Sequence, residues 1–158
     1  MGRYLNPGNI LFGKALNSQI YVDKSGLISY TNKVINSEQQ YICVSRPRRF
    51  GKSMAANMLA SYYGREVDSR SQFEKLKIGM DTTFEQHLNR YNVISLNMQE
   101  FFSRTHNMDK MLSLIEKSLI KEMKRAYPHL EGEDEDDLVS VLYDAHEDSG
   151  IPFVSEYV

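Results

Sequence analysis

Residues 41–54 read YICVSRPRRFGKSM, and the interpretation of the whole chain depends on them. The first five residues, 41–45, form an apolar run rich in strand-forming residues, which predicts a strand buried on both faces, as in a parallel sheet. Cys43 is then a buried small apolar residue. From Ser53 to Tyr63, apolar residues recur at helical spacing, which predicts a helix packed on that sheet. The stretch therefore reads as strand, basic loop and helix.

The loop ends like the phosphate-binding consensus G-x-x-x-x-G-K-[ST]. Arg46 stands where the consensus has its first glycine, and Pro47 biases it toward extended backbone, so we expect the turn to form within residues 47–50. Unpaired backbone N–H groups at the start of a helix form an anion site together with the helix dipole. Gly51 lets that backbone approach a phosphate closely, because it has no Cβ.

Each side chain of the loop has an expected role. Lys52 can reach the β- and γ-phosphates, and the Ser53 hydroxyl can ligate Mg²⁺. Arg48 and Arg49 add positive potential near the phosphates. The predicted nucleotide-binding residues are Arg46, Pro47, Arg48, Arg49, Phe50, Gly51, Lys52, Ser53 and Met54. Lys52 is the predicted catalytic residue and Ser53 the predicted metal ligand.

The rest of the chain continues the alternation of strands and helices. Helices are predicted over residues 26–35, 53–63 and 108–126 and from 138 onward, and strands over 91–98 and from 151. This order predicts an α/β layered fold with a mainly parallel sheet. Residues 1–19 read as an irregular lead-in, and residues 20–158 as one domain.

Composition excludes several classes of protein. The 158 residues carry a net charge of −2, so no overall positive field draws the chain to nucleic acid or anionic membrane. One cysteine allows no internal disulfide, and no apolar run approaches the length of a membrane span. We expect a cytoplasmic protein without membrane contact; the sequence leaves its oligomeric state open.

The octet RPRRFGKS of residues 46–53 resembles the loop of the AAA-ATPase-like proteins of bacteria and archaea, which are predicted P-loop ATPases. YVDKSGLI of residues 21–28 is similar to an upstream element of that family, and FEKLKI of residues 73–78 to a downstream one. The resemblance implies a three-layer P-loop NTPase fold that binds ATP with Mg²⁺ through Lys52 and Ser53. Full-length relatives commonly continue into a nuclease-like domain of the PD-(D/E)XK type, which implies a possible nucleic-acid partner.

One feature of the family is missing from the sequence. ATP hydrolysis in this class uses an acidic residue at the end of a strand, which the family places in the strand that begins near residue 151. Glu156 is a poor substitute, because no aspartate precedes it and the strand is expected to remain incomplete. Glu100 is better explained as a residue at a helix or turn entry. The sequence is therefore interpreted as an N-terminal fragment that binds nucleotide and hydrolyses it slowly or not at all.

Alternative functions remain open from the sequence. The domain could be a nucleotide sensor that never hydrolyses ATP. The basic loop could instead bind nucleic acid or an acidic partner, or simply connect a strand to a helix with Lys52 in solvent.

Overall fold

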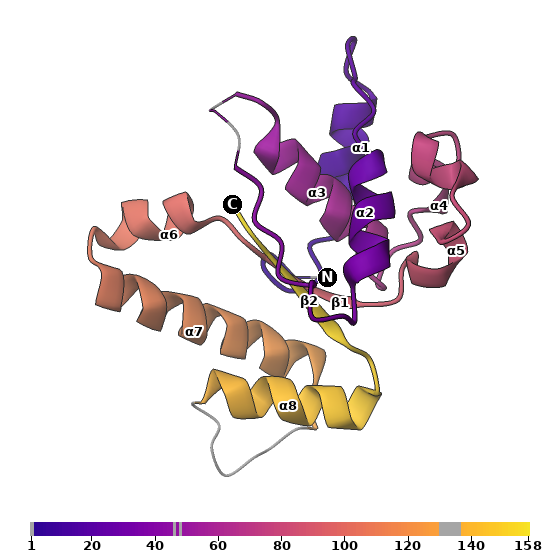
Figure 1. The fold of residues 1–158 in the computed structure, drawn as a ribbon. Helices are drawn as coiled ribbons and strands as arrows, with labels where there is room; N and C mark the ends of the chain where they lie inside the picture. The colour runs from indigo at the N-terminus through magenta and orange to yellow at the C-terminus, as the bar shows by residue number, and fades with distance from the viewer. Residues whose placement is uncertain (1, 46, 48, 130–136) are drawn as a thin grey trace. The chain divides into compact units, whose positions relative to one another are not determined.

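The computed structural model describes residues 2–45, 47, 49–129 and 137–158. The chain divides into two compact units (Figure 1). Gly8–Arg90 form one, here called the loop unit, and Met1–Pro7 with Tyr91–Val158 form the other, here called the sheet unit.

The sheet unit is built on two parallel strands, β1 (Asn92–Leu96) and β2 (Phe153–Tyr157), whose register runs from Asn92 opposite Phe153 to Leu96 opposite Tyr157. Three helices lie between the strands in sequence: α6 (Met98–Thr105), α7 (Met108–Ala126) and α8 (Leu138–Ser149). Parallel strands need such a long crossover, because a tight turn can join only antiparallel neighbours.

Local sequence explains where these helices begin and end. Asn97, Asn107 and Asp137 cap α6, α7 and α8, since each side chain accepts a hydrogen bond from a backbone N–H of the first turn. Gly150 ends α8 in the left-handed region with φ of 64°, a conformation that glycine adopts without a steric cost.

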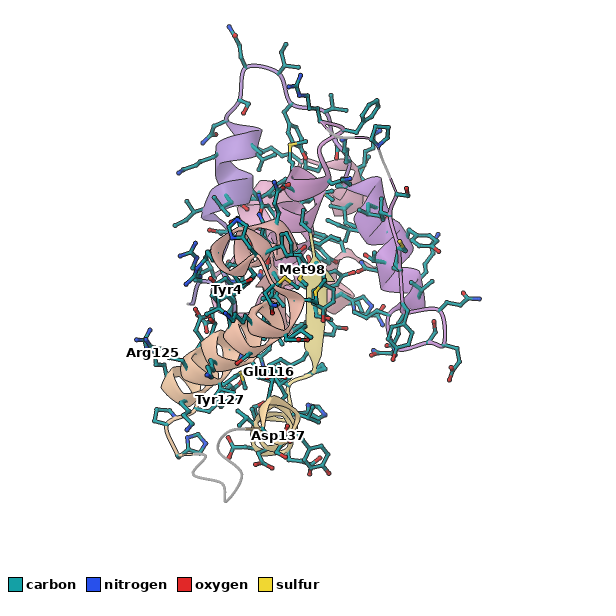
Figure 2. All side chains as sticks on the ribbon, turned by 90° about the vertical axis from the view of Figure 1, so that its left-hand side faces the viewer. Tyr4, Met98, Glu116, Arg125, Tyr127 and Asp137 are labelled. Atoms are coloured by element: carbon teal, nitrogen blue, oxygen red, sulfur yellow. The ribbon has the colours of Figure 1, made fainter. Side chains whose placement is uncertain are left out.

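A core of apolar side chains joins the strands to the helices of the sheet unit. Met111, Ile115, Leu119, Ile120 and Met123 of α7 form a buried apolar stripe at helical spacing, whereas Met108 and Leu112, predicted to share one stripe with them, are exposed. Figure 2 shows the side chains around this helix, with Glu116 and Arg125 along it and Tyr127 at its end. The core consists of Tyr4, Leu5, Ile94, Leu96, Phe101, Met111, Ile115, Leu119, Met123, Tyr127 and Ala145.

The first residues of the chain are part of the sheet unit. Leu5 forms an antiparallel bridge with Ile94 of β1. The Glu122 carboxylate of α7 accepts hydrogen bonds from the backbone N–H groups of Arg3, Tyr4 and Leu5 at 2.8–3.0 Å. One carboxylate therefore satisfies three consecutive amides and fixes this segment against α7.

The loop unit is mainly helical. Its elements are α1 (Ile10–Leu16), α2 (Gly26–Val34), α3 (Lys52–Tyr63), α4 (Arg70–Phe73), the 3-10 helix η1 (Lys77–Met80) and α5 (Phe84–His87). Phe73 stacks on Phe12 with ring centroids 4.9 Å apart and meets the edge of Tyr62 at 5.4 Å. These fully buried rings hold α1, α3 and α4 together.

Much of the predicted secondary structure is confirmed. The α/β class holds, with the parallel sheet represented by β1 and β2. The helices predicted over 26–35, 53–63 and 108–126 form as α2, α3 and α7 within about a residue or two, the usual uncertainty of helix ends. The strand predicted over 91–98 forms as β1.

The predicted buried strand at residues 41–45 is wrong. These residues belong to no strand in the structure and are exposed, with 88% of Tyr41 and 52% of Val44 accessible to solvent. Cys43, predicted to be buried there, is exposed as well. A strand is stabilised by backbone pairing with its neighbours, and the structure pairs this segment with no strand among the described residues.

Two other expectations differ from the structure. The lead-in of residues 1–19 is not wholly irregular, because it contains helix α1 and the bridge at Leu5. Gly13 weakens the helical pattern of this segment, because glycine is a poor helix former. The helix is short, and the buried ring of Phe12 supplies the packing that stabilises it. The strand expected to remain incomplete forms as β2 and runs to Tyr157.

None of the helices found in the described part of the chain is long and apolar enough to span a lipid bilayer.

Candidate functional site

The candidate site is the segment that leads into α3, and the structure describes most of it. Pro47, Arg49, Phe50, Gly51, Lys52, Ser53 and Met54 are placed, whereas Arg46 and Arg48 lie outside the described residues. The expected extended backbone at Arg46 therefore stays a prediction.

The bend of the loop uses two left-handed residues. Arg49 has φ of 69° and Gly51 has φ of 75°. The turn predicted within residues 47–50 thus includes Arg49, and a second left-handed position follows at Gly51. Glycine adopts this conformation freely, whereas arginine pays about 1–2 kcal/mol for it. The loop consequently depends on contacts that compensate for the conformation of Arg49.

Helix α3 begins at Lys52, directly after this bend. Gly51 is its N-cap residue, and no side chain among the described residues caps the helix. Lys52 and Ser53 are exposed, and 62% of Phe50 is accessible. A helix start of this kind presents backbone N–H groups and the positive end of the helix dipole to solvent, which favours an anion.

The far end of α3 is fixed in the core. Met58 and Tyr62 are buried, and Asn32 of α2 donates a hydrogen bond to the Tyr62 hydroxyl at 3.0 Å. The Tyr63 hydroxyl donates to the Asn32 side-chain oxygen at 2.7 Å and lies 2.6 Å from the Thr31 hydroxyl. This network holds α3 against α2, so the exposed start of α3 projects from a rigid support.

The YVDKS element of residues 21–25 contacts the loop. The Lys24 ammonium donates a hydrogen bond to the Phe50 carbonyl oxygen at 2.7 Å. A Cβ atom built on Gly51 would lie only 2.8 Å from Lys24 Nζ. Sequence reasoning assigned no role to Lys24, because nothing in local spacing indicates a contact between residues this far apart in the chain.

Asp23 anchors the same element to η1. Its carboxylate accepts hydrogen bonds from the backbone N–H groups of Ser25 and Lys77, both at 2.8 Å. Burial acts to raise the pKa of Asp23, but these hydrogen bonds and the nearby Lys77 outweigh it, and the pKa lies below its ordinary value. The carboxylate therefore stays charged and keeps its partners at neutral pH.

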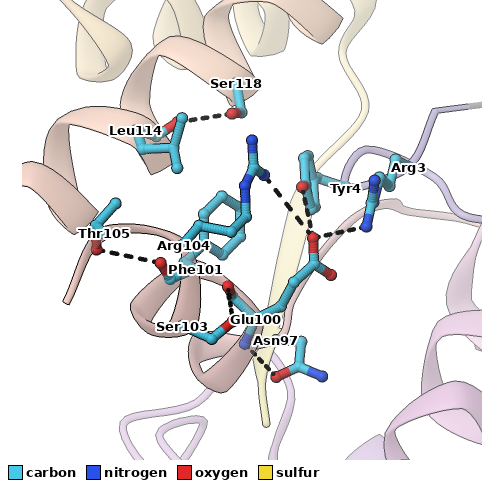
Figure 3. A network of polar contacts seen from close by, with 10 residues as sticks. All are labelled: Arg3, Tyr4, Asn97, Glu100, Phe101, Ser103, Arg104, Thr105, Leu114 and Ser118. Carbon is cyan, nitrogen blue, oxygen red and sulfur yellow. Dashed lines mark hydrogen bonds and ion pairs between the residues drawn. The ribbon is translucent and has the colours of Figure 1, made fainter.

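Glu100 has a structural role in the sheet unit, at a helix entry as expected from the sequence. It lies in the first turn of α6, and its carboxylate binds the Arg3 guanidinium at 2.6 Å (Figure 3). The Tyr4 hydroxyl donates to the same oxygen at 3.3 Å, and Arg104 lies 3.9 Å from it. Figure 3 shows these three groups converging on one carboxylate.

Glu156 lies on β2, opposite Ser95 of β1. The Ser95 hydroxyl donates a hydrogen bond to one carboxylate oxygen of Glu156 at 2.5 Å, and the other oxygen is buried with no hydrogen-bond partner among the described residues. Desolvation raises the pKa of Glu156 to about 7, despite the opposing effect of the Ser95 hydrogen bond. The carboxyl group is therefore only partly charged at neutral pH.

The described residues contain no cluster of three or more histidine, cysteine, aspartate or glutamate side chains that could hold a metal ion.

Comparison with known proteins identifies the family. A family model described as predicted AAA-ATPase matches residues 14–155. The chain belongs to this AAA-ATPase-like family. The match covers the YVDKS element, the loop and strand β1, and so includes the residues on which the resemblance rested. Comparisons with curated proteins and with solved structures gave no match. Family membership supports nucleotide binding as the general activity of the chain.

Proposed function

We propose that the loop of residues 46–54 binds the phosphates of ATP together with Mg²⁺. The observation that carries this proposal is the left-handed bend at Gly51 directly before an uncapped, exposed helix start in an AAA-ATPase-like chain. Under this proposal the domain belongs to a three-layer P-loop NTPase and works in the cytoplasm, where ATP is available.

The residues of the loop fit such a ligand. The exposed Lys52 side chain lies in the first turn of α3 and can pair with the β- and γ-phosphates. The neighbouring Ser53 hydroxyl would hold the metal, and Mg²⁺ would neutralise phosphate charge and bridge the phosphate oxygens. The amides of Gly51, Lys52 and Ser53 would bind phosphate oxygens, which Gly51 permits because no Cβ keeps the ligand away.

We propose that residues 1–158 bind ATP with slow or no hydrolysis. Turnover in this class requires an acidic group that stays charged, so that it can hold the metal shell and orient water. Glu156 is the acidic residue on β2, but its burial raises its pKa to about 7 and its hydrogen bond ties it to Ser95. A buried carboxyl group that is only partly charged at neutral pH is poorly suited to that role.

Titration of the 158-residue chain with ATP and Mg²⁺ tests the proposal. Wild type is expected to bind, and Lys52→Ala to lose about tenfold or more in affinity, because a charge-assisted contact with phosphate is removed. Lys14→Ala is the matched control, since Lys14 is an exposed lysine on helix α1 of the same unit. Isothermal titration calorimetry at fixed salt measures all three proteins.

Binding equal for wild type and Lys52→Ala would contradict the proposal. Salt-dependent binding of DNA that ignores ATP would instead favour the interpretation of the loop as a basic interaction surface.

A further inference from the structure

We propose that Lys24 is a positioning residue of the phosphate-binding loop: its ammonium holds the Phe50 carbonyl and thereby fixes the bend at Gly51. The functional consequence of this inference rests on the proposed nucleotide binding. The structural part concerns the ligand-free loop and can be tested by itself.

Lys24 contacts both Phe50 and Gly51. Lys24 Nζ lies 2.7 Å from the Phe50 carbonyl oxygen, a short distance typical of a charge-assisted hydrogen bond. The same ammonium packs directly over the backbone of Gly51, since a Cβ there would come within 2.8 Å of it. A side chain at residue 51 would therefore have to displace the Lys24 ammonium.

The base of the Lys24 side chain is held in place. On one side Asp23 accepts hydrogen bonds from the Ser25 and Lys77 backbones, and on the other the Ser25 hydroxyl accepts one from the Ile78 N–H at 3.1 Å. Ser25 and Ile78 are fully buried. Two side chains that flank Lys24 thus fasten it to η1, and the lysine reaches the loop from a fixed point.

Electrostatics explains why a lysine is suited to this position. A carbonyl oxygen carries partial negative charge, so a Phe50 carbonyl that turned toward a phosphate would repel it. The ammonium binds that oxygen and keeps it occupied. Arg49 adopts the unfavourable left-handed conformation, and both Arg49 and Phe50 are exposed, so burial holds neither residue in place. The hydrogen bond from Lys24 therefore stabilises this part of the loop.

The first test uses the ligand-free protein. Lys24→Met keeps the length and apolar part of the side chain but removes the donor. We expect the backbone amide of Ala55, which donates to the Gly51 carbonyl at 3.0 Å, to exchange with solvent hydrogen several-fold faster in this variant, because the bend that holds this acceptor opens more often. Lys24→Arg keeps a donor and is expected to restore most of the protection. Lys14→Met serves as the matched control.

The midpoint of thermal unfolding shows whether Lys24 acts only on the loop or stabilises the whole loop unit. It is expected to stay within about 2 °C of wild type in Lys24→Met, because the contact is exposed. Unchanged exchange at the Ala55 amide would overturn the inference. So would a large fall in the unfolding midpoint with faster exchange throughout the loop unit, since Lys24 would then stabilise the whole unit.

The second test measures ATP·Mg²⁺ affinity. Lys24→Met is expected to weaken binding about tenfold, with partial recovery in Lys24→Arg. If wild type does not bind ATP, the proposed function fails, whereas the exchange result still decides whether Lys24 positions the loop. If wild type binds, Lys52→Ala does not, and Lys24→Met binds like wild type, the proposed function stands and the role of Lys24 is overturned.

Discussion

Residues 41–45 and β1 have similar sequences and different structures. The first read YICVS and the second NVISL, and both are short apolar runs that predict a buried strand. NVISL pairs with β2 along its length and bridges to Leu5, and its Ile94 is 6% exposed. YICVS belongs to no strand, and its Ile42 is 39% exposed.

The difference shows that an apolar, strand-forming composition is not enough to make a strand. A strand-forming run becomes a strand only where other segments provide backbone partners and a face to pack on. β1 receives both from distant parts of the chain: Asn6 exchanges hydrogen bonds with Val93, and α7 covers the sheet with its apolar stripe. The run at residues 41–45 receives neither within the described structure.

The largest expected effect is a difference in stability between matched substitutions in the two runs. Ile94→Ala is expected to lower the free energy of unfolding by about 3 kcal/mol, because it removes buried apolar surface and leaves a cavity. Ile42→Ala is expected to cost less than about 1 kcal/mol, because its side chain is already partly in water. Urea unfolding followed by circular dichroism measures both. Equal costs would mean that residues 41–45 are packed as a strand in solution.

A smaller effect is expected from the buried carboxyl group of β2. Because folding raises the pKa of Glu156 from 4.5 to about 7, the folded chain holds this proton more tightly than the unfolded chain. The contribution of the protonated Glu156 side chain to the free energy of unfolding is fully present below pH 4.5 and is lost as the pH rises through 7. Glu156→Gln is therefore expected to stabilise the chain at pH 8, by up to about 3 kcal/mol, and to have little effect at pH 4.

Unfolding midpoints of wild type and Glu156→Gln across pH 4–8 test this expectation. Parallel curves for the two proteins would show that Glu156 titrates normally and is more hydrated than the structure indicates. In that case Glu156 would be charged at neutral pH and available to take part in hydrolysis.

The sequence was a good guide where a pattern is local. The helical spacing of apolar residues in α7 acts within a few residues, and α7 forms over the range predicted from that spacing. Helix α6 was missed because it is short and begins at Met98, which the predicted strand over residues 91–98 included. The left-handed bend at Gly51 was consistent with the glycine, but the second one at Arg49 is set by the surrounding structure.

The candidate site was predictable only in part, for the same reason. The loop residues and the start of α3 follow from the GKS tripeptide and the helical pattern after it. The contact of Lys24 with Phe50 joins two segments that only folding brings together, and the burial of Glu156 depends on the pairing of β2 with β1. No local pattern encodes either interaction.

The central claim is that the amides at the start of α3 hold phosphate, and backbone NMR spectra recorded during a titration with ATP and Mg²⁺ test it most directly. We expect the largest shifts on the amides of Gly51, Lys52 and Ser53; they should saturate with ATP and disappear in Lys52→Ala. Shifts confined to other parts of the chain, or equal shifts in wild type and Lys52→Ala, would contradict it.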